Sequence, residues 1–277
     1  DNNYLEKFWE DISSMTDCKP FFIIYNNEEK KEEITEMKDF FNKVMQYYSS
    51  IYETTKPLDD KMLVLIGILT YSYKRFSEII EYNLYNSIVG RSIIRVLIED
   101  FIMIKYLLKK ESEKPNIWTE YQSYGIGQLK LIEKRFQAVA ETLEKSHVEY
   151  KYLEIIVNDY INEEFLNMDT RYFDSQNIRL KAEYVNEKDL FGLYYDYDSS
   201  FEHGLWGAIR ECALLKCEAA GHQYHCVPDY TNNQKCKSIW YDSVVTLLKT
   251  IKEISNIYSL SDELKERMSK YAAKYSI

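Results

Sequence analysis

Three charged side chains stand four residues apart in an otherwise apolar segment of the chain: Arg91, Arg95 and Glu99. A helix stacks residues with this spacing on one face. The surrounding residues leave almost no other polar surface; they include Ile93, Ile94, Val96, Leu97, Ile98, Phe101, Ile102 and Ile104. A helix that is apolar nearly all round is normally buried, so the charged groups need polar partners inside the protein.

A second segment, about a hundred residues later, repeats the same spacing with Tyr195, Ser199 and His203. Hydroxyl and imidazole groups can pair with both arginine and glutamate. We therefore expect the two helical faces to meet and to form one polar cluster.

The functional interpretation of this cluster is a site for a phosphate-bearing substrate. Arg91 and Arg95 would bind the phosphate-like anion, and His203 would act as acid or base. Glu99 or Ser199 could orient the imidazole ring. The predicted catalytic set is His203, Arg95, Glu99, Ser199 and Tyr195. The alternative is a structural network, in which buried Arg–Glu pairs and their hydroxyl partners fix how two helices pack.

Cysteines and histidines crowd a later region, and no metal or other cofactor is required by the favoured interpretation. Zinc prefers thiolate and imidazole ligands, so a structural zinc site is the alternative. Its ligands would come from Cys217, His222, His225, Cys226 and Cys236. The spacing fits no common pattern of two ligand pairs, which favours ordinary loop and core residues.

The elements that must position these residues are predicted to be helices. Only 8 glycines and 4 prolines occur among 277 residues, which favours helices over a glycine-punctuated sheet. The fold class is all-α, a multi-helix bundle with a short N-terminal extension. Residues 1–58 are assigned to the extension and 59–277 to the main domain with the polar cluster. Helices are expected over 30–54, 60–82, 86–110, 116–145, 148–167, 187–218, 238–256 and 261–275. Residues 168–186 are expected to be irregular and 219–236 to form a loop with cysteines and histidines, and Gly125 and Gly127 mark a kink or a close approach in the helix over 116–145.

The formal net charge of −10 argues against a broad nucleic-acid or anionic-membrane surface, although a local basic groove stays open. The longest apolar run, Met62 to Leu69, is too short to cross a bilayer. The first residues resemble no signal peptide, and five cysteines without a regular framework are typical of reduced thiols. We expect a cytoplasmic protein, and a segment preceding Asp1 could be missing.

The pattern Arg95-x3-Glu99 followed by Tyr195-x3-Ser199-x3-His203 resembles an uncharacterised bacterial family of all-helical proteins, over roughly residues 60 to 250. More distantly, the chain is similar to HEPN-type helical domains of bacterial toxins and phage-defence systems, many of them metal-independent ribonucleases. Their signature places an arginine four to six residues before a histidine, and none stands there before His203, His222 or His225.

The HEPN resemblance implies a bacterial stress or phage-defence effector that acts on RNA or a nucleotide, with a site shared between two subunits of a homodimer. The competing class is a non-catalytic binding or regulatory module. In that class the cluster is structural and a protein partner docks on the acidic surface.

Overall fold

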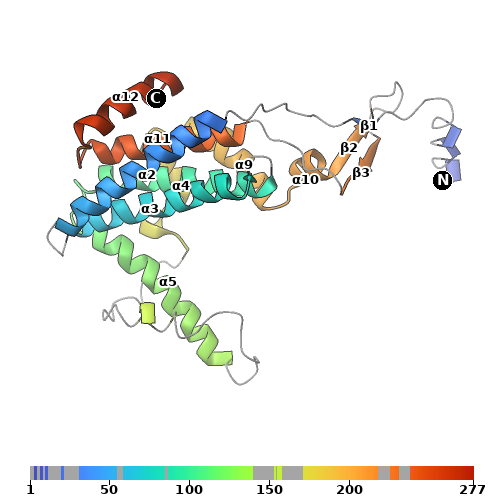
Figure 1. Cartoon of the computed structure of the whole chain (residues 1–277). Coiled ribbons are helices and arrows are strands. Elements are labelled where there is room, and N and C mark those ends of the chain that lie inside the picture. The colour runs from blue at the N-terminus through green and yellow to red at the C-terminus, as the bar shows by residue number, and fades with distance from the viewer. Residues whose placement is uncertain are drawn as a thin grey trace.

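The computed structural model describes residues 3–4, 7–8, 10–11, 20–21, 31–54, 59–84, 87–139, 153, 155–157, 171–217, 225–230 and 238–277. Its body is a stack of long helices, from which α5 and a small sheet project in different directions (Figure 1). The long helices are α2 (Lys31–Thr54), α3 (Asp60–Glu81), α4 (Ile88–Lys110), α5 (Ile117–Val139), α11 (Ser238–Ser255) and α12 (Asp262–Tyr275). The predicted all-α class is therefore confirmed, with a three-stranded sheet as the exception.

The central helix is α4, which packs against α3, α11 and the shorter helix α9 (Asp196–Glu202). Its first turn is capped by Ser87, whose side chain accepts a hydrogen bond from the Gly90 amide, and its last turn carries Lys109 and Lys110. A side chain at Gly90 would not fit, because a Cβ there would lie 2.2 Å from the Leu84 carbonyl oxygen. The predicted ranges 60–82 and 86–110 agree closely with α3 and α4.

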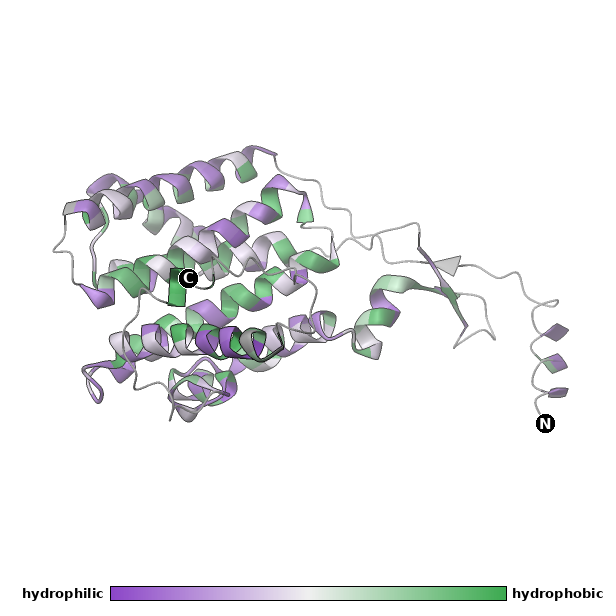
Figure 2. Ribbon diagram, turned by 90° about the horizontal axis from the view of Figure 1, so that it is seen from below, coloured by the Kyte–Doolittle hydropathy of each residue, from purple (hydrophilic) through white to green (hydrophobic). Residues whose placement is uncertain are grey.

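Helix α2 lies in the range assigned to the N-terminal extension, yet it belongs to the main core. Met37, Phe40 and Val44 are fully buried in the same apolar cluster as the central helices. The C-terminal helix α12 packs on α2 through Tyr271, whose ring lies 4.9 Å from that of Phe40. Residue 59 therefore does not separate two cores. Figure 2 shows hydrophobic and hydrophilic residues alternating along the long helices.

The helix predicted over 187–218 is wrong as one element. The segment consists of α8 (Lys188–Leu190), a π-helical turn η4 (Phe191–Tyr195), α9, α10 (Trp206–Ala213) and the strand β2 (Leu214–Cys217). The break after α9 follows from Gly204, whose φ of 58° is in the left-handed region. The amide of Leu205 then donates to the Ser200 carbonyl at 2.9 Å and that of Gly204 to the Phe201 carbonyl at 3.3 Å. This hydrogen-bond pattern is the Schellman helix ending.

Two further segments differ from the prediction. Helix α7 (Ile178–Tyr184) lies in a range expected to be irregular, and the expected cysteine- and histidine-bearing loop contains the strand β3 (Cys226–Pro228). Strand β2 pairs antiparallel with both β1 (Pro20–Phe21) and β3. Most of the helix predicted over 148–167 lies outside the described residues. Within the described parts of the chain, no helix is long and apolar enough to span a membrane.

Candidate functional site

The two predicted polar faces meet where α4 packs on η4 and α9. Arg95 donates from Nε to Ser199 Oγ at 3.0 Å and from Nη2 to Tyr195 Oη at 2.8 Å. The guanidinium carbon also lies 4.9 Å from the centre of the Tyr195 ring. Glu99 completes the group, with its Oε2 atom 3.7 Å from Arg95 Nη1 and 3.5 Å from the Tyr195 hydroxyl, which donates to it. We call these four residues the Arg95 cluster.

Tyr195 acts in this cluster as a neutral phenol. Its ring stacks on Phe191 at 4.6 Å within the π-helical turn, and the residue is buried. Burial raises the pKa of the Tyr195 hydroxyl and the nearby Glu99 carboxylate adds to the effect, while Arg95 opposes it. The hydroxyl therefore keeps its proton, accepts from Arg95 and donates to Glu99.

One turn earlier on α4, Arg91 has different partners. Its Nη1 atom lies 3.4 Å from Asp198 Oδ1 and 3.6 Å from Asp242 Oδ2. Its Nη2 atom donates to Ser238 Oγ at 2.7 Å, and the rings of Tyr197 and Phe201 pack on the guanidinium group at 5.0 and 5.9 Å. We call Arg91, Asp198 and Asp242 the Arg91 triad.

The triad holds two carboxylates against one guanidinium in a buried place. Burial raises the pKa of Asp198 to about 7; Arg91 opposes this shift and Asp242 adds to it. Burial also raises the pKa of Asp242, against the effect of Arg91 and Ser238. Sequence reasoning missed both acids, although Ser238 and Asp242 stand four apart at the start of an apolar helix. The same signal had singled out the arginines.

His203 is not part of either group. It is solvent-exposed at the C-terminal end of α9, where its backbone amide donates to the Ser199 carbonyl at 3.1 Å. Among the described residues, its ring makes no hydrogen bond or ion pair with Arg91, Arg95 or Glu99. The helical spacing from Ser199 to His203 is kept in the backbone, but the His203 side chain is exposed and does not join the Arg95 cluster.

A cavity of about 600 Å³ lies beside the Arg95 cluster and reaches it through Glu99. Its walls come from α3, α4, α5 and residues 171–181, and its lining is mostly apolar and aromatic. It also contains Lys181, which is only 2% exposed. Lys181 Nζ donates to the carbonyl oxygens of Phe173, at 2.6 Å, and Gln176. Burial lowers the pKa of Lys181 to about 8, opposed by Asp174 and Glu99.

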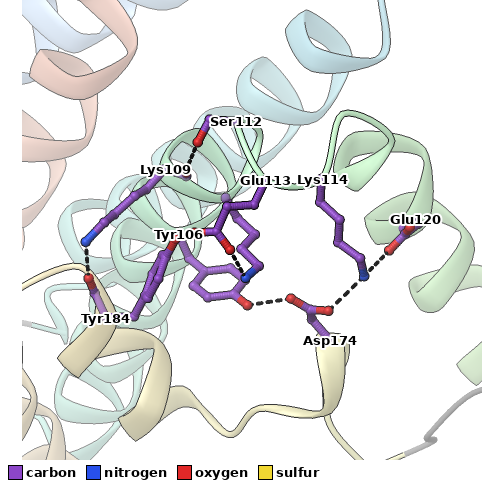
Figure 3. A network of polar contacts seen from close by, with 9 residues as sticks. Tyr106, Lys109, Ser112, Glu113, Lys114, Glu120, Asp174 and Tyr184 are labelled. Atoms are coloured by element: carbon purple, nitrogen blue, oxygen red, sulfur yellow. Dashed lines mark hydrogen bonds and ion pairs between the residues drawn. The ribbon is translucent and has the colours of Figure 1, made fainter.

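A polar network fixes the 171–184 segment that forms one wall of this cavity (Figure 3). Asp174 accepts hydrogen bonds from the Tyr106 hydroxyl and from Lys114 Nζ, and Lys114 also donates to Glu120 at 2.7 Å. Burial would raise the pKa of Asp174, but these two donors bring it below its usual value. The ionised carboxylate therefore ties the segment to the end of α4 and the start of α5.

The proposed zinc ligands are only partly described. His222 and Cys236 lie outside the described residues. Because Lys216 pairs with Cys226 in the sheet, Cys226 and Cys217 belong to opposite faces of it. In the part of the chain that the structure describes, no three His, Cys, Asp or Glu side chains are placed to hold a metal ion.

The fold and site define a mainly helical domain with one buried and one half-buried arginine at a helix interface, beside a mostly apolar cavity. Residues 62–222 match the model of a family of unknown function (DUF5677), and the chain belongs to this family. The match includes both arginines, α9 and the whole cavity lining, but not Ser238 or Asp242. No curated protein and no solved structure matches the chain.

Proposed function

We propose that the domain is a non-catalytic binding and regulatory module in which the arginines hold α9 against α4. One observation carries this proposal: carboxylate and hydroxyl groups of the protein itself already bind both guanidinium groups. A phosphate approaching Arg91 would meet Asp198 and Asp242, and one approaching Arg95 would meet Glu99. Like charges oppose binding strongly at the buried Arg91 triad, where water is excluded, and more weakly at the partly exposed Arg95 cluster.

RNA cleavage by a stress or phage-defence effector of HEPN-like type is the second candidate. The exposure of His203 favours it, because a general acid or base must reach its substrate. Trp206, 68% exposed and three residues further on, offers a surface on which a base could stack. The net charge of −10 opposes it, since a negative surface repels RNA.

Turnover experiments separate the two functions. The purified chain would be incubated with total RNA and, separately, with ATP and GTP, and the products followed by gel electrophoresis and chromatography. We expect the parent protein, His203→Ala and the neighbouring control Glu202→Ala to leave all substrates intact. Cleavage by the parent and the control but not by His203→Ala would overturn the proposal and establish the nuclease.

A further inference from the structure

We propose that the cavity between α3, α4, α5 and residues 171–181 binds a small molecule with a ring-bearing apolar body and a single anionic group. This inference rests on the proposed function, a binding module, and adds the chemical class of the ligand. The volume of about 600 Å³ lies within the range of small-molecule pockets.

Aromatic and aliphatic side chains form the walls. The rings of Tyr121 and Tyr124 pack edge-on against Phe173, with centroids 5.2 and 5.6 Å away. Leu63, Val64, Ile68, Met103 and Ile126 also line the cavity. A flat aromatic ring of a ligand placed beside Phe173 could pack against these rings in the same edge-to-face way. An aromatic ligand therefore fits the cavity better than a polar one.

Two solvent-exposed glycines stand in the wall of the cavity. Gly67 of α3 and Gly125 of α5 both line it, and a Cβ at either position would meet nothing within 4 Å. Close packing therefore does not explain these glycines, and neither does a turn, because both lie inside continuous helices. A glycine in a helix interior costs about 1 kcal/mol relative to alanine. Their effect is to leave room on two helices that contribute to the same cavity.

The charges favour an anionic ligand. Lys181 and Arg171 both line the cavity, whereas the one carboxylate in the lining, Glu99, is already paired with Arg95. Within the described residues, no carboxylate lies within ion-pair distance of Lys181, although this ammonium group is almost fully buried. Two backbone carbonyls accept two of its three N–H bonds. A carboxylate or sulfonate on the ligand would supply the missing negative charge.

The first experiment uses 1-anilinonaphthalene-8-sulfonate, a fluorescent dye with aromatic rings and one sulfonate. We expect saturable binding to the parent protein. Gly67→Leu and Gly125→Leu place a side chain in the cavity and should each weaken binding about tenfold or more. Gly207→Leu makes the same change on α10, also where nothing lies within 4 Å, and should leave the affinity unchanged.

The melting temperature shows whether lost binding reflects unfolding. Leucine favours a helix more than glycine does, so Gly67→Leu and Gly125→Leu should melt no lower than the parent. Weaker binding by a protein of equal or higher stability supports the proposal. Equal dye affinity in the parent and in both cavity variants would overturn it, because the dye would then bind elsewhere. This outcome leaves the RNA and nucleotide turnover results unaffected.

A second experiment tests the anionic group through competition by 2-naphthoate and 2-naphthol, which share one ring system. We expect the carboxylate to displace the dye from the parent at lower concentration than the alcohol does. Lys181→Met should abolish this preference, and Lys181→Arg should retain it. Because Lys181 also holds two carbonyls, Arg171→Gln at an exposed position provides a second variant in which the preference should decrease. Equal displacement by both competitors in the parent would overturn the anionic part of the proposal.

Discussion

Arg91 and Arg95 stand one turn apart on α4 and both contact α9, yet their environments differ. The Arg91 side chain is 6% exposed and that of its partner Asp198 only 1%. The Arg95 side chain is 22% exposed and that of Glu99 is 40% exposed. The same residue type on the same helix face therefore forms a buried ion-pair group at one position and a half-buried hydrogen-bonded cluster at the next.

The difference in burial changes what each arginine contributes. Charges buried away from water attract one another strongly, but each loses its hydration, so removing one partner leaves the others uncompensated. In the Arg91 triad this would leave two carboxylates. In the Arg95 cluster the main partners are hydroxyl groups, and water can reach the site when the arginine is removed. We infer that the triad is essential to the packing of α9 and that the Arg95 cluster adds to it.

Removing Arg91 should have the largest effect. Arg91→Met keeps much of the side-chain volume but leaves Asp198 and Asp242 buried without their cation. We expect a loss of about 3–5 kcal/mol in the free energy of unfolding. Urea denaturation measures it, with Arg179→Met as the control, since the Arg179 side chain is 67% exposed. A loss below about 1 kcal/mol would contradict the proposed difference between the two arginines.

The second-largest effect should be on the pH dependence of stability, to which the Arg91 triad contributes through Asp198. The pKa of Asp198 is raised to about 7 in the folded protein, from an ordinary value of about 3.9 in the unfolded chain. The folded state therefore binds more protons between these values. The stabilisation from this proton is complete below about pH 4 and is lost as the pH rises through about 7.

Asp198→Asn removes this proton-binding group and should flatten the fall in stability between about pH 4 and 7. Asp100 will retain part of the slope, because burial raises its pKa to about 7 as well. Denaturation at a series of pH values tests both, and Asp198→Asn/Asp100→Asn should be flatter than either single variant. An unchanged slope in Asp198→Asn would mean that the carboxyl group titrates normally.

The sequence was sufficient to predict the meeting of α4 with Tyr195 and Ser199, because polar residues four apart in apolar helices need buried partners. It was not sufficient for the partners of Arg91. Asp198 precedes Ser199 by one residue, but Asp242 lies on α11, and only the packing of three helices brings these acids together. The sequence did not show that His203, the residue at which α9 ends, is exposed.

The cavity was beyond prediction for the same reason as the triad. Lys181 belongs to a range expected to be irregular, and its lining partners come from three other helices. Gly125 suggested a kink or a close approach between helices. The structure instead shows α5 continuing through it, with open space where a side chain would stand. A single sequence shows that a helix contains a glycine, but not whether another element or open space lies beside that glycine.

Removing Arg95 should have a smaller effect than removing Arg91. Arg95→Met loses hydrogen bonds to Ser199 and Tyr195, which are worth about 1–2 kcal/mol together after exchange with water. Tyr195→Phe, which keeps the ring, should cost about 1 kcal/mol or less. Urea denaturation under the conditions used for Arg91→Met measures both losses in the free energy of unfolding. A loss from Arg95→Met equal to that from Arg91→Met would show that burial does not distinguish the two positions.

The smallest effect should come from His203. Its ring is exposed and lies outside both arginine groups, so His203→Ala should change the free energy of unfolding by no more than about 0.5 kcal/mol. Ser199→Ala, one turn earlier on α9, is the comparison, because it removes the acceptor for Arg95 Nε and should cost more. If His203→Ala proved the more damaging of the two, the imidazole would have to contact the Arg95 cluster in solution. The division of α9 into a packed face and an exposed end would then be incorrect.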